Sequence, residues 1–279
     1  DLEDPELASL PGAVIGRVLF MQGRFSESLQ ILDEAIPLLE RRKSQHELLF
    51  AYVHRSMAQT CLGQYAAGLS GLNRTLEIAR SSQDQNAEVM AHAGLGFAQV
   101  VAGEYAEGIA SANEALAIAE KSGDTYFRYA INGFLAWGTF GLGKARESLP
   151  YWAAATEAAK ALGARLLLGE WFAGVEAESL IEAIDPATGL RRAQEALTLS
   201  QNAESMMGEA LAERAIGRAL AAGKEGSREA LPHLTRSVEI CDEIGAKFEL
   251  VRSLLAQGAA YANCGDRTEA ATALGKAKT

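Results

Sequence analysis

The sequence has few of the side chains that usually carry catalysis or metal binding. Its three cysteines show no Cys-x-x-Cys spacing, which favours a reducing compartment over a disulfide framework. No two of its four histidines lie four residues apart, as two metal ligands on one helix face would. No Ser-His-Asp or Cys-His arrangement stands out. We therefore expect no enzyme, no cofactor and no metal site. The histidines are His46, His54, His92 and His233.

Positive charge and long apolar runs are also lacking. Lys and Arg number 26 against 36 Asp and Glu, and the net charge of −10 argues against a nucleic-acid binder, which needs clustered cations. No run of eighteen apolar residues occurs, so we expect no membrane span and a cytoplasmic protein. The chain begins with Asp rather than Met, and no basic-then-apolar signal precedes it. We expect a segment excised from a larger protein.

Proline is scarce as well, with 6 residues against 27 glycines, and this ratio indicates many short turns. The glycines reveal a repeat. The surrounding text recurs as GRFSES, GQYAAG, GEYAEG and GKARES at four glycines that are each forty residues from the last, Gly23, Gly63, Gly103 and Gly143. After two slips of one residue the series ends at Gly265.

Two columns of small residues, seven positions apart, follow the same register. Positions seven apart lie on one face of a helix, so two small residues there predict a close crossing by another helix. A leucine at such a crossing would overpack it. The first column is Ser28, Gly68, Gly108, Ser148, Gly189, Ala230 and Ala270. The second column is Ala35, Thr75, Ala115, Ala155, Ala196, Ser237 and Ala277.

Helix ends are marked in the same register. Gly123, Gly163 and Gly245 each follow the second small position by eight residues and suit a left-handed C-terminal cap. Asp124 then suits the N-cap of the next helix. The repeating unit is helix, tight turn, helix and cap, and seven copies predict an all-α chain of about fourteen helices in one domain, residues 1–279. The predicted repeats are 6–43, 46–83, 87–123, 126–163, 166–204, 207–245 and 248–279.

The segment GTFGLGKA at residues 138–145 is one hydroxyl short of a phosphate-binding loop. Such a loop follows a strand, whereas a helix is predicted before Gly143. Gly23, Gly63 and Gly103 hold the same repeat position without a following lysine. We therefore interpret Gly143 as a turn glycine and Lys144 as a solvated turn residue.

The pattern resembles the tetratricopeptide repeat family, and it is clearest in Gly96, Gly103, Tyr105, Gly108 and Ala115. The resemblance implies a right-handed α-solenoid of about seven repeats that binds proteins or peptides. The phrase GRVLFMQGRFSESLQILDEAIPLLE is similar to helical C-terminal regions that follow ATPase modules in bacterial nucleotide-cyclase and LuxR-type regulators. It implies a sensor or regulatory arm of a bacterial signalling or transcription regulator. A small-molecule or short-peptide receptor that responds through its superhelix is the alternative.

In a solenoid of this family the first helices of the repeats line a concave groove. Aligning them gives a row with apolar and aromatic residues in its middle and arginines at its ends. The stripe is either ordinary helix core or a binding groove, and both interpretations stay open. As a groove it would bind its ligand through Arg17, Phe20, Met57, Phe97, Trp137, Phe140, Trp171 and Arg218. Only Arg17 could serve the carboxylate clamp for which the family is known.

Two further expectations concern charge and assembly. Glu176, Glu178 and Glu182 share a helix face, which is more typical of a solvated face than of an acid–base pair. The sequence stops at Thr279 within the predicted last helix, without a polar capping helix. Repeat arrays need such caps, so we expect the exposed end to pack on a segment missing from this sequence or on another copy, as a homodimer through the uncapped C-terminal repeat.

Overall fold

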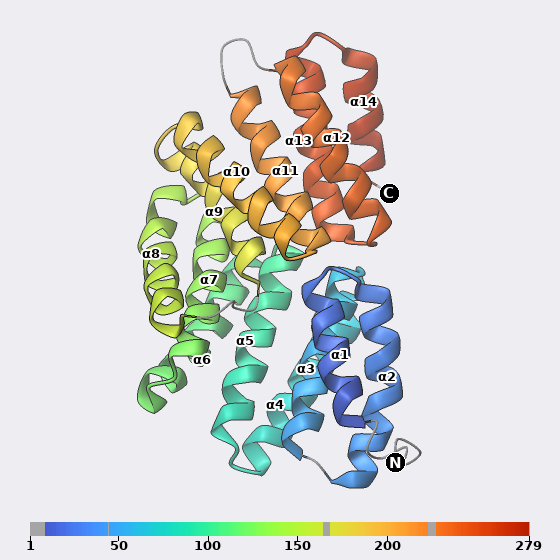
Figure 1. The fold of residues 1–279 in the computed structure, drawn as a ribbon, viewed down its shortest axis with the longest axis vertical. Coiled ribbons are helices and arrows are strands. Elements are labelled where there is room, and N and C mark those ends of the chain that lie inside the picture. Colours follow the sequence, from blue (N-terminus) through green and yellow to red (C-terminus); the bar gives the residue numbers. More distant parts are fainter. Residues whose placement is uncertain (1–8, 44, 164–167, 223–226, 279) are drawn as a thin grey trace. The chain divides into compact units, whose positions relative to one another are not determined.

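A computed structural model describes residues 9–43, 45–163, 168–222 and 227–278, and every regular element in these ranges is an α-helix. Figure 1 shows the fourteen helices in chain order. They are α1 (Ser9–Met21), α2 (Phe25–Arg42), α3 (Gln45–Cys61), α4 (Tyr65–Ser81), α5 (Gln85–Ala102), α6 (Tyr105–Ser122), α7 (Thr125–Gly141), α8 (Ala145–Leu162), α9 (Gly169–Ala183), α10 (Pro186–Asn202), α11 (Met206–Ala221), α12 (Ser227–Glu243), α13 (Lys247–Asn263) and α14 (Arg267–Lys276).

The helices pack in the order of the chain. Consecutive helices contact each other from α1 through to α7, and again from α9 through to α14. The first helices of neighbouring repeats also contact each other, α1 with α3, α3 with α5, α5 with α7, α9 with α11 and α11 with α13. This is the packing of an α-solenoid of helical repeats, and it confirms the predicted fold class. The right-handed superhelix stays a prediction.

The chain divides into two compact units. Unit 1 contains residues 1–142 and 150–165, and unit 2 contains residues 143–149 and 166–279. The prediction of one domain therefore stays a prediction. The helices follow one another in pairs along the chain, and the predicted repeat bounds stay a prediction, with the ends at 6, 166 and 279 outside the described residues.

The turn glycines adopt the predicted backbone. Positive φ angles occur at all five turn glycines and at the three predicted caps, Gly123, Gly163 and Gly245. Asp124 caps α7 by accepting a hydrogen bond from the Phe127 amide at 3.0 Å. Gly143 has a φ of 77° between α7 and α8, and Lys144 pairs at 3.2 Å with Glu147 on the surface. The interpretation of this segment as a turn, with an exposed lysine, is confirmed.

The small-residue columns mark close helix crossings, as predicted. Thirteen of the fourteen positions are buried, and Ala277 is half-buried. At Gly108 in α6, a Cβ would lie 3.0 Å from the Val100 backbone nitrogen and 3.1 Å from the Gly96 carbonyl oxygen, both in α5. At Ser28 the close crossing is also bridged by a hydrogen bond, because the serine hydroxyl donates at 2.7 Å to the Gly16 carbonyl oxygen of the crossing helix. The crossing therefore sets the residue size in each repeat.

We expect Gly108→Ala to lower the free energy of unfolding by about 1–3 kcal/mol, because its Cβ would overlap backbone atoms that cannot move independently. Gly275→Ala in α14 is the matched control, since nothing lies within 4 Å of its Cβ. Alanine favours helix by up to about 1 kcal/mol over glycine, so the control should be neutral or slightly stabilising. Urea unfolding of both variants measures the difference. Equal behaviour of the two variants would contradict the close crossing.

Candidate functional site

Most of the eight residues that were predicted to line a binding groove are buried in the structure. Five of the eight candidate residues are buried, and three are half-buried. The buried ones are Phe20, Met57, Phe97, Trp137 and Trp171. The half-buried ones are Arg17, Phe140 and Arg218. A ligand could touch the five buried side chains only if helices moved apart, so their role in binding stays a prediction.

In unit 1 the aromatic members of the row pack against one another. The Phe97 ring of α5 lies edge-on to Phe20 of α1, with centroids 5.9 Å apart, and to Phe134 of α7, with centroids 5.7 Å apart. Phe20 also meets the His54 ring of α3 at 6.0 Å. Rings from four successive first helices thus fill the space where these helices meet. Here the stripe is helix core, one of the two interpretations that the sequence left open.

Beside these rings, unit 1 contains a set of four residues that surrounds one arginine, and we call it the Arg17 cluster. Its members are Arg17, Phe50, His54 and Tyr126. Arg17 comes from α1, Phe50 and His54 from α3, and Tyr126 from α7. The Arg17 guanidinium lies 5.2 Å above the centre of the Phe50 ring, a cation–π contact. Phe50 and His54 stack as neighbours on one face of α3, with ring centroids 4.3 Å apart. Direct contacts within the cluster therefore join α1 to α3, and Tyr126 of α7 is linked to them through the effect of the Arg17 charge on its pKa.

His54 is buried and carries an unused hydrogen-bond acceptor. Its Nδ1 lies 2.9 Å from the Phe50 carbonyl oxygen, which can only accept, so the proton is on Nδ1. Nε2 is then an acceptor, and it has no partner. Burial, with a smaller contribution from Arg17, lowers the pKa of His54 to about 4. The imidazole is therefore neutral at neutral pH.

Arg17 brings to the cluster a positive charge that no carboxylate of the described ranges neutralises. Among the described residues no carboxylate forms an ion pair with it, and its buried Nε has no acceptor. The other buried or half-buried arginines that the structure describes, Arg55, Arg192, Arg214, Arg218 and Arg252, each pair with a carboxylate. Burial raises the pKa of Tyr126, and the nearby Arg17 opposes that rise. Thus the cluster combines an unpaired guanidinium, an imidazole acceptor and a phenol.

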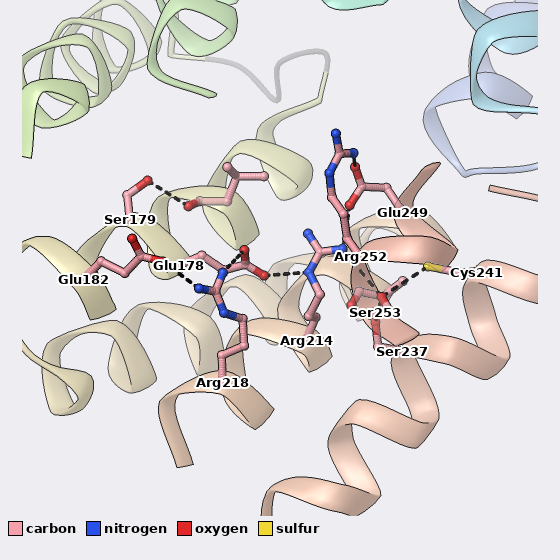
Figure 2. Close-up of polar contacts among 12 residues, drawn as sticks. Glu178, Ser179, Glu182, Arg214, Arg218, Ser237, Cys241, Glu249, Arg252 and Ser253 are labelled. Atoms are coloured by element: carbon pink, nitrogen blue, oxygen red, sulfur yellow. Dashed lines mark hydrogen bonds and ion pairs between the residues drawn. The ribbon is translucent and has the colours of Figure 1, made fainter. Parts of the chain in front are cut away.

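Unit 2 holds its first helices together differently, through a chain of ion pairs that runs from the surface at Glu182 to the buried Arg214 and Glu249 (Figure 2). We call these six residues, Glu182, Arg218, Glu178, Arg214, Glu249 and Arg252, the ion-pair chain. In it, Glu178 of α9 accepts from Arg214 Nε at 2.7 Å and from Arg218 Nη1 at 2.6 Å. Arg218 also reaches Glu182 at 2.6 Å, and Arg214 reaches Glu249 of α13 at 2.5 Å. Arg252 pairs with the other Glu249 oxygen.

The charges of the ion-pair chain compensate one another. Burial alone would raise the pKa of Glu178, but Arg214 and Arg218 outweigh burial and hold it below its usual value. In the same way Glu178 and Glu249 outweigh the burial of Arg214 and keep its pKa raised. Three carboxylates alternate with three guanidinium groups. Arg218, predicted to bind a ligand, pairs with Glu178 and Glu182, and its role in binding stays a prediction.

A buried cysteine lies at one edge of this network. Cys241 Sγ is 3.8 Å from Ser253 Oγ, which in turn lies 2.8 Å from Ser237 Oγ. Ser237 donates at 2.7 Å to the Ala210 carbonyl oxygen, so the Ser253 hydroxyl donates to Ser237. Burial raises the pKa of Cys241 to about 12, which keeps its thiol protonated and unreactive. These side chains stabilise the contact of α11, α12 and α13.

Sequence reasoning missed two features of these sites. The expectation of a solvated face was wrong for Glu178, which is buried, because its two arginine partners lie 36 and 40 residues away in the next repeat. Tyr126 was not considered, because it lies in the first turn of α7, outside the aligned row. The spacing of Glu178 and Arg218, one repeat apart, is a signal that could have revealed the ion pair.

Within the described ranges, no group of three or more His, Cys, Asp or Glu side chains could hold a metal ion. None of the helices described is long and apolar enough to cross a membrane.

Comparison with known proteins gives no assignment. No protein-family model matches the chain, and no curated protein matches it significantly. The resemblance to the tetratricopeptide repeat family therefore still rests on the spacing of glycines and small residues.

Proposed function

We propose that this chain is a protein-interaction module of the tetratricopeptide type, a right-handed solenoid that binds a peptide or helix. Its proposed setting is the cytoplasm, as a sensor or regulatory arm of a bacterial signalling or transcription regulator. The Arg17 cluster is the proposed anchor for an acidic group of the partner. The aromatic row around it supplies packing that holds the first helices in place.

The observation that carries this proposal is the charge of Arg17, which pairs with no carboxylate among the residues that the structure describes. A half-buried guanidinium without a carboxylate is costly, and a partner's carboxylate would neutralise it. His54 Nε2 is an acceptor shielded from solvent, so a peptide N–H would reach it only if the helices around it moved apart. An acidic residue of a peptide would pair with the Arg17 guanidinium.

Selection from a random peptide display library on the intact chain tests the proposal. We expect the enriched peptides to share an Asp or Glu and to bind Arg17→Gln at least about tenfold more weakly, because a hydrogen bond to a charged group contributes about 1.5–3 kcal/mol. Arg55→Gln is the matched control. Arg55 is also half-buried on a first helix, but it already pairs with Asp33 at 2.5 Å. Its replacement should leave peptide affinity unchanged.

Two results would count against peptide binding. If no peptide is enriched, or if Arg17→Gln and Arg55→Gln bind the enriched peptides equally well, the Arg17 cluster is not the anchor. A receptor for small acids is the second candidate, because Arg17 Nε and His54 Nε2 are both shielded from solvent. It would be indicated by thermal stabilisation with small carboxylic acids that disappears in Arg17→Gln.

A further inference from the structure

We propose that the ion-pair chain is a relay, in which the charge of Glu182 at the surface sets how firmly α11 holds α13. The chain crosses three first helices, and Figure 2 shows it running from Glu182 on α9, through Arg218 and Arg214 on α11, to Glu249 and Arg252 on α13. Its surface end therefore lies on a different helix from the contact that it controls.

Arg214 links α11 to α13. Its Nη1 donates to Glu249 at 2.5 Å and to the Ser253 hydroxyl oxygen at 3.5 Å, and both of these partners are buried. Among the neighbouring first helices that contact each other, α11 and α13 share the least extensive contact. A change in the pair between Arg214 and Glu249 therefore alters a large part of what joins these two helices.

The inner members of the ion-pair chain each divide themselves between two partners. Glu178 accepts from Arg214 with one carboxylate oxygen and from Arg218 with the other. Arg214 in turn donates to Glu178 through Nε and to Glu249 through Nη1. The side chains of Glu178, Arg214 and Glu249 are at most 5% exposed, so water screens these pairs little. A partner that is drawn more strongly to one side is therefore held less strongly on the other.

The chain is open to solvent at Glu182, whose side chain is 41% exposed. A basic group of a partner that pairs with Glu182 would draw this carboxylate away from Arg218. Arg218 would then bind Glu178 more firmly, and Glu178 would hold Arg214 less. Arg214 would pair more closely with Glu249 as a result. Neutralising one charge on α9 thus tightens the contact between α11 and α13.

Amide hydrogen exchange of the full chain tests the relay, with Glu182→Gln in place of a bound basic group. Glutamine keeps the shape of the side chain and removes its charge. We expect the amides of α13 to exchange at least about twofold more slowly than in the wild type, while those of α10 stay unchanged. Glu195→Gln is the matched control, because Glu195 is an exposed glutamate that pairs with Arg192 at 3.2 Å outside the ion-pair chain. It should leave the exchange of α13 unchanged.

A second variant at the other end of the chain tests whether the two ends are coupled. Arg252→Gln removes one of the two arginine partners of Glu249, so Glu249 binds Arg214 more firmly before Glu182 is changed. The slowing of α13 exchange that Glu182→Gln causes should therefore be smaller in the Arg252→Gln background than in the wild type. Two independent sites would give the same factor in both backgrounds.

Three outcomes would overturn the proposal. If α13 exchanges as fast as in the wild type or faster in Glu182→Gln, the surface pair acts only on its own neighbours. If α10 and α13 slow equally, the substitution has changed the stability of unit 2 as a whole and nothing is relayed. If the factor is the same with and without Arg252, the two ends of the ion-pair chain are independent.

Discussion

Replacing Arg214 with methionine is expected to lower the free energy of unfolding of unit 2 by about 3–5 kcal/mol. The substitution keeps most of the side-chain volume but removes the guanidinium that Glu178 and Glu249 share. Both carboxylates are almost completely buried, so each would lose part of its compensation in a place that water cannot reach. Urea unfolding followed by circular dichroism measures the loss.

Two further variants separate the ion-pair chain from an ordinary surface effect. Arg74→Met removes an exposed ion pair with Glu77 and should change stability by no more than about 1 kcal/mol. Adding Glu178→Leu and Glu249→Leu to Arg214→Met removes the buried charges together with their partner. This triple variant should recover most of the stability. If Arg214→Met is as mild as Arg74→Met, water reaches the ion-pair chain.

Acid is expected to destabilise unit 1 through His54. In the folded chain the pKa of His54 is lowered to about 4, below the value of about 6.5 in an unfolded chain. The fold therefore favours the neutral imidazole, and this contribution to stability is complete above pH 6.5 and is lost as the pH falls towards 4. Over that interval the loss is about 3 kcal/mol.

The measurement compares the wild type with His54→Phe at a series of pH values. Phenylalanine already occurs once at this repeat position, because Phe134 holds the equivalent position in α7. Carboxylates titrate in both proteins, so the difference between their free energies of unfolding isolates the histidine. We expect that difference to shift by about 3 kcal/mol in favour of the variant between pH 6.5 and 4. A difference that does not vary with pH would mean that His54 is accessible to protons in the fold.

The fold could be predicted in detail because its constraints act within one repeat. Glycine suits a positive φ, as at Gly103 and Gly143, and a small residue is needed where two helix backbones cross, as at Gly108. The turn glycine returns in five copies and the small residues in all seven, so a single sequence shows both requirements repeatedly. Boundaries, caps and turns followed from that repetition.

The candidate site was less predictable because exposure depends on contacts between repeats. Phe97 and Trp137 follow the same spacing whether they face a groove or a neighbouring helix, and only the packing of α5 against α3 and α7 decides between the two. Glu178 shares the row with these aromatic residues, yet its environment is set by Arg214 in another repeat. A period locates a side chain on its helix but does not identify its neighbours.

The ion-pair chain also limits how α9 and α11 can slide past each other. Glu178 and Glu182 are one helical turn apart on α9, and Arg214 and Arg218 are one turn apart on α11. A slide of one helix along the other by one turn, about 5.4 Å, would leave one arginine and one glutamate of these four without an ion-pair partner among the four. Smaller slides would disturb the two pairs that Glu178 makes with Arg214 and Arg218. The ion-pair chain therefore favours one alignment of these two helices.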